Sequence, residues 1–179
     1  MTAVLVEEGP DKGAIWHFGE PTKEQRALER GQAWADLSHH EIIAISGVDR
    51  LSWLHSLTTQ HLEKLAPGVW QQALILDPQG HIEHQFYLVD DGRTSWLMVD
   101  PGRAAALIEY LQKMKFMLRV EVRDASAEYA ILRAPGIADE LGGPYALVLR
   151  TELAQMQKTF AATALQVGTW ALDAQRVAA

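Results

Sequence analysis

The stretch VWQQALILDPQGHIEHQFYLV, residues 69–89, decides the fold that the sequence predicts. Val69 to Leu76 is a largely apolar run that predicts one strand, and Ile82 to Val89 predicts a second. Between them, Asp77-Pro78-Gln79-Gly80 is typical of a tight turn, because Pro suits the second position and Gly the fourth. The stretch therefore predicts an antiparallel hairpin.

The sequence on either side of the hairpin predicts further strands and two helices. The leucines of Asp49–Leu57 recur at intervals of three, which indicates an amphipathic helix, whereas Arg119–Arg123 alternates strictly and indicates a strand. Asp100 is a natural N-cap for a helix that begins at Pro101. The elements expected around the hairpin are strands at Ser38–Ser46, Thr94–Val99 and Arg119–Arg123, and helices at Asp49–Leu57 and Pro101–Lys115.

This order of elements predicts an α+β fold, with a mainly antiparallel sheet and packed helices related to ferredoxin-like units. Outside the core we expect a helix over Glu24–Asp36, strands at Ala127–Leu132 and Tyr145–Leu149, a helix from Thr151 to about Ala164, and a helical stretch after Gly168. That last stretch carries apolar residues up to the end of the chain, so we expect the chain to be truncated there. The expected parts are a lead-in with the first helix at 1–37, a core α+β unit at 38–125, and a second α+β portion at 126–179.

Composition places the chain among globular proteins and excludes several kinds of chemistry. Of its 179 residues, 48% are hydrophobic and 22% are charged, which is enough apolar material for a sizeable core. Cysteine is absent, so disulfides, thiolate metal ligands and a cysteine nucleophile are excluded. The formal net charge of -7 argues against direct nucleic-acid binding. With no long apolar run and an acidic N-terminus, we expect a soluble cytoplasmic protein with no membrane contact.

Patterns for catalysis or metal binding are weak in this sequence. His81 and His84 are three residues apart and His39 and His40 are adjacent, so on strands the members of each pair would face opposite ways. We therefore expect no metal site. The GxSxG, GxGxxG and P-loop motifs are absent, and no catalytic residue is assigned. The six tryptophans fit either core packing or an aromatic wall for a flat heterocyclic ligand.

Several segments, in a fixed order, carry a resemblance to a known family. The most extended is residues 47–60, GVDRLSWLHSLTTQ, and it is followed by LDPQGHI at 76–82 and VDP at 99–101. The lead-in GAIWHFGEP at 13–21 and the segment GTWALDAQR at 168–176 frame them. Their order and spacing resemble the YgfZ and glycine-cleavage T-protein superfamily, over nearly the whole chain.

The resemblance implies an aminomethyltransferase folate-binding domain type, built from ferredoxin-like halves around a central hole that holds tetrahydrofolate. YgfZ-type members are implicated in the maintenance of iron–sulfur cluster enzymes and in tRNA modification, which implies iron–sulfur proteins as partners. T-proteins instead transfer an aminomethyl-derived carbon to tetrahydrofolate. Matching positions imply that Gln72, Gln85 and Asp100 lie nearest the folate, with Leu54 on its apolar side.

Two departures from the family pattern separate these alternatives. T-proteins carry an Ile-Asp-Asp run that assists folate chemistry, and here the run is Glu83-His84-Gln85. The YgfZ motif Lys-Gly-Cys-Tyr-x-Gly-Gln-Glu is absent from the chain. We therefore expect the N-terminal part of a YgfZ-like folate-binding protein that is not an enzyme by itself. The alternatives are a tetrahydrofolate-dependent aminomethyltransferase and a non-catalytic interaction scaffold.

Overall fold

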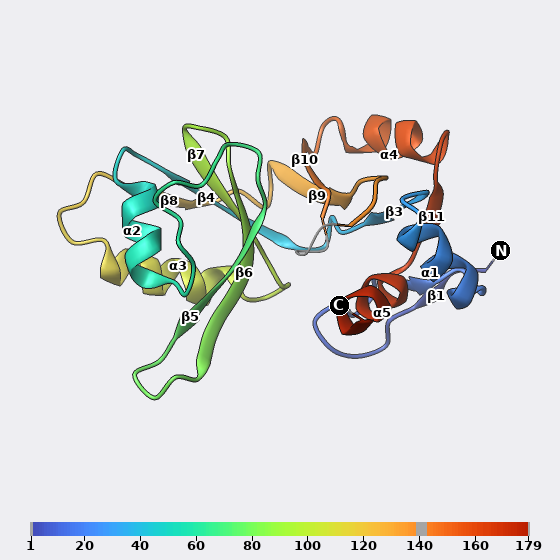
Figure 1. Ribbon diagram of the computed structural model, residues 1–179, viewed down its shortest axis with the longest axis horizontal. Coiled ribbons are helices and arrows are strands. Elements are labelled where there is room, and N and C mark those ends of the chain that lie inside the picture. The colour runs from blue at the N-terminus through green and yellow to red at the C-terminus, as the bar shows by residue number, and fades with distance from the viewer. Residues whose placement is uncertain (1, 139–142, 179) are drawn as a thin grey trace. The chain divides into compact units, whose positions relative to one another are not determined.

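The computed structural model describes residues 2–138 and 143–178, and the chain divides into two compact units (Figure 1). We call Glu41–Ala127 the central unit, and Met1–His40 together with Glu128–Ala179 the terminal unit. Within the described ranges, no helix has the length and apolar character that crossing a membrane requires.

The central unit is a five-stranded antiparallel sheet with two helices, and its strand order is β5-β6-β7-β4-β8. The predicted hairpin is confirmed, because β5 and β6 pair with Gln72 opposite Tyr87. The predicted α+β class is also confirmed. The elements are β4 (Glu41–Ser46), α2 (Arg50–Leu57), β5 (Gln71–Leu76), β6 (Ile82–Asp90), β7 (Thr94–Val99), α3 (Ala104–Met114) and β8 (Glu121–Asp124).

Both helices of the central unit, all of whose residues are described, pack on one face of its sheet (Figure 1). Successive side chains of a strand point to opposite faces, so every second residue of each strand joins the core. The core residues from the hairpin and the helices are Ala73, Ile75, Phe86 and Leu88 of the hairpin, Trp53 and Leu54 of α2, and Leu107 and Leu111 of α3. Residues that alternate with these, among them Gln72, Leu74, Gln85 and Tyr87, face away from the helices and form the surface of the hairpin.

The terminal unit contains a four-stranded sheet in the order β10-β9-β3-β11 and a two-stranded sheet of β1 and β2. Strand β11 runs parallel to β3, and the other pairs are antiparallel. One small apolar core forms with α1 and α5, and another forms with α4. The elements are β1 (Val4–Leu5), β2 (Ile15–His17), α1 (Pro21–Glu29), β3 (Ala33–Asp36), β9 (Tyr129–Arg133), β10 (Tyr145–Leu149), α4 (Leu153–Ala161), β11 (Leu165–Val167) and α5 (Thr169–Ala178).

Two predicted helices of the terminal unit are shorter than expected, because a strand follows each. The helix predicted over Glu24–Asp36 ends at Glu29, and Ala33–Asp36 is strand β3. Between them Gly31 has φ +69°, and a Cβ there would lie 2.7 Å from the carbonyl carbon of Gly136. The helix ends in a glycine cap, in which the N–H groups of Gly31 and Gln32 donate to the carbonyls of Leu28 and Ala27. The predicted helix from Thr151 ends at Ala161, and β11 follows.

The prediction that Asp100 caps a helix beginning at Pro101 is wrong. Helix α3 begins at Ala104, with Arg103 as its N-cap and no cap bond from that side chain. The carboxylate of Glu41 provides the cap instead, because its Oε2 accepts the backbone N–H of Ala104 at 2.7 Å. The long-range contact with β4 therefore decides where the helix starts.

Candidate functional site

The face of the hairpin that points away from the helices carries the first candidate site. Gln72 pairs with Tyr87 and Leu74 pairs with Gln85 in the register of β5 and β6. Directly opposed side chains in an antiparallel pair have Cβ atoms about 5 Å apart. The hairpin therefore places two amide side chains, an aromatic ring and an aliphatic side chain side by side on one open surface, which we call the hairpin face: Gln72, Leu74, Gln85 and Tyr87.

Asp100 extends this surface at the end of β7. Met98 of β7 pairs with Tyr87, and so it lies on the same side of the sheet. Asp100 follows two residues later, is exposed, and lies where the chain leaves the strand for a turn. Its backbone carbonyl accepts the N–H of Arg103 at 3.1 Å. By the alternation of β7, Asp100 lies at the rim of the hairpin face.

Leu54 lies on the opposite side of the sheet. It belongs to α2, has an exposed fraction of 0%, and packs in the core between the helices and the strands. Its side chain is separated from the hairpin face by the sheet itself. Among the four residues implied by the family resemblance, the structure brings Gln72 and Gln85 together, places Asp100 nearby, and leaves Leu54 as core support.

Tyr87 was not among the residues predicted for the site, although a signal for it was present. It is two residues after Gln85, and residues two apart on a strand share a face. The register places it directly across from Gln72. Its ring supplies an aromatic surface beside the two amides.

The run Glu83-His84-Gln85 is split between the two faces of the sheet by a bulge. Ile75 pairs with His84 and Leu76 pairs with Ile82, which leaves Glu83 as the extra residue on β6. The His84 ring lies on the helix side, 5.5 Å from the ring of Tyr110. Burial lowers the pKa of His84 below its ordinary value, against an opposing effect of Glu83, and Arg103 lowers it further. A histidine is neutral or cationic, so this position supplies no carboxylate, and its ring lies on the helix side of the sheet, away from the hairpin face.

A buried ion pair holds α2 to the C-terminal end of β6. Arg50 donates to both carboxylate oxygens of Asp90 at 2.7 Å, and Ser95 and the backbone N–H of Gly92 donate to the same carboxylate. Burial raises the pKa of Asp90, but the hydrogen bonds from Arg50, Ser95 and Gly92 outweigh it, so the pKa lies below its usual value. The network fixes the end of the strand that carries Gln85 and Tyr87.

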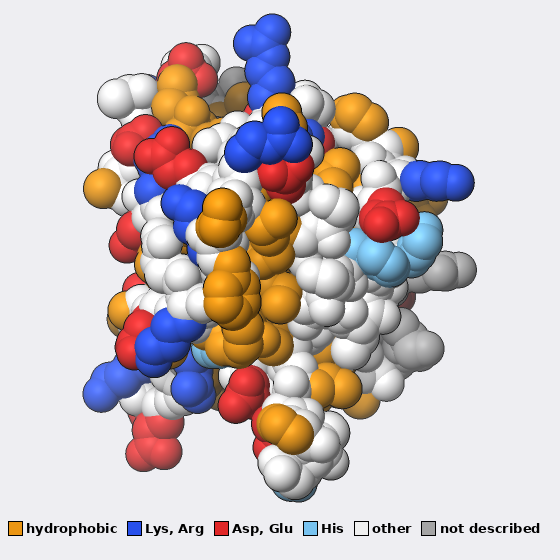
Figure 2. Space-filling view, turned by 90° about the vertical axis from the view of Figure 1, so that its left-hand side faces the viewer, with side chains coloured by type: hydrophobic (Ala, Val, Ile, Leu, Met, Phe, Trp, Pro, Cys, Tyr) orange, Lys and Arg blue, Asp and Glu red, His pale blue; other side chains and the backbone are white. Residues whose placement is uncertain are grey.

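A second surface feature of the central unit is apolar. Figure 2 shows hydrophobic side chains gathered in a strip on the face that lies at the left of Figure 1, the side of α2 and of the segment between α3 and β8. Met117, Phe116 and Val48 are the most exposed large hydrophobic residues of the central unit, at 98%, 85% and 71%. Exposed apolar patches are typical of interaction surfaces. This strip is chemically distinct from the amide-rich hairpin face.

The fold defined above is that of the aminomethyltransferases. The structure matches glycine cleavage system aminomethyltransferase T from Bartonella henselae with a TM-score of 0.74 at 15% sequence identity, and the match covers 96% of this chain and 57% of that one. Residues 14–170 match the GCVT N-terminal domain family. The chain belongs to this family, and the resemblance predicted from residues 47–60 and the segments around them is confirmed.

Two curated relatives of similar sequence are named for different functions. An aminomethyltransferase from Thermus thermophilus is 29% identical over 115 residues, which is 64% of this chain and 33% of that protein. An iron–sulfur cluster assembly factor IBA57 homolog, mitochondrial, from Mycosarcoma maydis is 23% identical over 147 residues, or 69% of this chain and 36% of that protein. The chain thus spans about a third of the length of these relatives.

Proposed function

We propose that the chain binds a tetrahydrofolate-type ligand on the hairpin face, as the N-terminal part of a YgfZ-like protein. Membership of the GCVT N-terminal domain family supports the ligand class, because the aminomethyltransferases of this family act with folate. The main support for placing the ligand on the hairpin face is the register of β5 and β6, in which Gln72 is opposite Tyr87 and the neighbouring pair is Leu74 and Gln85.

The chemistry of the hairpin face suits a flat heterocycle with donors and acceptors along its edge. A glutamine side chain offers two N–H donors and a carbonyl acceptor. Gln72 and Gln85 can therefore form hydrogen bonds with the donors and acceptors along the edge of an aminopyrimidinone ring. Tyr87 and Leu74 provide the apolar surface for the ring. Asp100 provides a carboxylate at the rim for a ring N–H or amine. Leu54 acts on the site only through packing under the sheet.

The role that we propose is support of iron–sulfur proteins and of the tRNA modification that depends on them, with iron–sulfur proteins as partners. The name of the Mycosarcoma maydis relative supports the iron–sulfur part of this role. The run Glu83-His84-Gln85 argues against the alternative below, because it lacks the Ile-Asp-Asp run that the resemblance implies for T-proteins. The alternative is aminomethyl transfer to tetrahydrofolate, which the Thermus thermophilus relative favours. An interaction scaffold without a ligand is the third candidate.

Isothermal titration of tetrahydrofolate and of folinic acid into the full chain tests the ligand and its location. We expect saturable binding that weakens about 3- to 10-fold in each of Gln72→Ala, Gln85→Ala and Asp100→Ala, the loss typical of one hydrogen bond. Gln79→Ala is the matched control, because this glutamine is exposed in the hairpin turn, away from the paired residues. Equal affinity in all five proteins refutes the location, and no binding at millimolar ligand favours the scaffold.

Single-turnover assays with an aminomethyl donor separate the two folate-dependent roles. For a YgfZ-like role, we expect no methylene transfer to tetrahydrofolate above the uncatalysed rate, even at saturating folate. Methylene transfer that is lost in Asp100→Asn or in Glu83→Gln establishes the aminomethyltransferase alternative instead. Such a loss means that the carboxylate takes part in proton transfer near the reacting nitrogen.

A further inference from the structure

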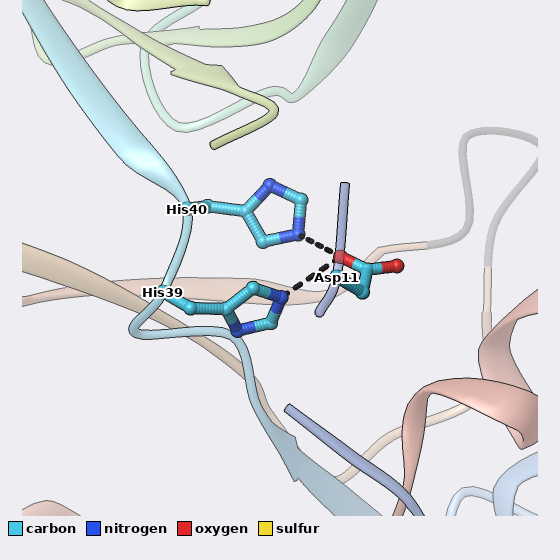
Figure 3. Close-up of side chains that lie close together, drawn as sticks. All are labelled: Asp11, His39 and His40. Carbon is cyan, nitrogen blue, oxygen red and sulfur yellow. Dashed lines mark hydrogen bonds and ion pairs between the residues drawn. The ribbon is translucent and has the colours of Figure 1, made fainter. Parts of the chain in front are cut away.

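Three potential metal ligands meet at one point in the terminal unit (Figure 3). Asp11 lies in the turn between β1 and β2, and His39 and His40 lie in the turn that follows β3. Oδ1 of Asp11 is 2.9 Å from Nε2 of His39 and 3.7 Å from Nε2 of His40. The three ligand atoms all lie within 4.8 Å of one another, and all three residues are half-buried.

The local fold explains why adjacent histidines converge, which corrects the expectation that they face opposite ways. That expectation requires a strand, but β3 ends at Asp36. Asp36 Oδ1 accepts the backbone N–H of Ser38, and the N–H of His40 is donated to the carbonyl of Leu37, so residues 37–40 form a turn. In this turn the two imidazole rings lie with their centroids 4.6 Å apart, and both point toward Asp11 (Figure 3).

We propose that Asp11, His39 and His40 form a binding site for a divalent transition-metal ion of the zinc class. In a tetrahedral zinc site with ligands at about 2.0–2.1 Å, neighbouring ligand atoms are about 3.4 Å apart. The distances of 2.9 and 3.7 Å from the Asp11 oxygen lie on either side of this value. Shifts of about half an ångström or less in these side chains bring both of these distances to it.

A hydrogen bond alone accounts for only half of this arrangement. At 2.9 Å the Asp11–His39 contact is a hydrogen bond that ties the N-terminal lead-in to the turn. The distance of 3.7 Å to His40 is beyond hydrogen-bond range, yet the His40 ring nitrogen points at the same oxygen. At this distance the His40 contact is an ion pair, and a cation bound among the three residues would take these same three atoms as its ligands.

The donor set selects the kind of ion. Two imidazole nitrogens and one carboxylate oxygen suit zinc, copper, nickel or iron, whereas magnesium and calcium prefer oxygen ligands. Three protein ligands leave a fourth position for water or a small ligand. A pocket of about 350 Å³ adjoins the site and is lined by His39, Ser38, Asp36 and Lys12, among others. The pocket meets the site at His39, so there is room beside this ligand for a water molecule or a small anion near Lys12.

Titration of zinc chloride into the full chain, freed of metal with a chelator, tests the site, and cobalt absorption spectra report the coordination. We expect one ion per chain, with affinity reduced roughly 100-fold or more in His39→Ala and in His40→Ala, because each removes a direct ligand, and losing even an outer-sphere partner reduces affinity by about 10- to 100-fold. His81→Ala is the matched control, because His81 also pairs with a carboxylate, Asp77 at 2.8 Å, but no third potential ligand joins this pair among the described residues.

The His40→Ala variant separates a metal site from a structural contact. We expect it to lower zinc affinity and to reduce the rise in melting temperature that a fixed zinc concentration gives the wild type, while circular dichroism of the metal-free variant shows that it is folded. Zinc affinity equal to wild type in His40→Ala, or binding that is lost instead in a His55→Ala control, overturns the proposal. So does the absence of saturable binding at millimolar zinc. The site is independent of the folate proposal, because none of its ligands belongs to the hairpin face.

Discussion

At the scale of single residues, Gly47 shows why the family motif at residues 47–60 begins with a glycine. Its φ is +111°, and a Cβ at this position would lie 2.0 Å from the carbonyl oxygen of Arg119. Arg119 in turn donates from its backbone and side chain to the carboxylate of Asp49, two residues after the glycine. The motif thus encodes a close backbone approach between the start of α2 and the segment before β8.

Gly47→Ala should destabilise the chain by more than the strain of its backbone conformation, which alone is about 1–3 kcal/mol. The added Cβ also collides with backbone atoms that cannot rotate away. Gly68→Ala is the matched control, because Gly68 also has a positive φ of +81° but has open space around its missing Cβ. Urea denaturation checks both variants. Equal losses of unfolding free energy would show that the collision with Arg119 is relieved by a shift of the chain.

At the scale of elements, the hairpin and the strands near Ala127–Leu132 and Tyr145–Leu149 could be predicted, and the strands β3 and β11 could not. The run from Val69 to Val89 contains its own turn, so pairing is local and the shared face of Gln72 and Gln85 follows from alternation. Ala33–Asp36 is a strand only because β9 and β11 lie beside it, and its alanines favour a helix on their own. Likewise, Asp11 is 28 residues from His39, so no local pattern indicates their contact.

The ion pair between α2 and β6 gives a pH-dependent prediction. Arg50→Met should lower the unfolding free energy at pH 7 by about 3–5 kcal/mol, because Asp90 is left buried without its partner. The pKa of Asp90 is lowered in the native chain, so its contribution is complete above the unfolded pKa of about 3.9 and is lost as pH falls through the folded pKa. In the variant, burial favours the protonated form.

The difference between wild type and Arg50→Met should therefore shrink on acidification, beginning as pH falls through the raised pKa of Asp90 in the variant and ending below its lowered pKa in the wild type. Denaturation curves between pH 3 and 7 measure it. Arg119→Met, which removes the partner of Asp49 from an exposed pair, serves as the control and should have a smaller effect at every pH. A difference that stays constant over this range contradicts the assignment of Asp90 as the ionised partner.

At the scale of the whole molecule, the two proposed sites belong to different units, so hydrogen exchange with mass spectrometry can separate them. Folinic acid should protect peptides from residues 69–100, because β5 is an edge strand whose amides exchange by local opening. Zinc should protect peptides that contain Asp11 and residues 37–41. At ligand concentrations near the wild-type dissociation constants, Gln85→Ala should reduce only the first protection and His40→Ala only the second. Protection of residues 37–41 by folinic acid, or of the hairpin by zinc, contradicts the assignment of the two ligands to these surfaces.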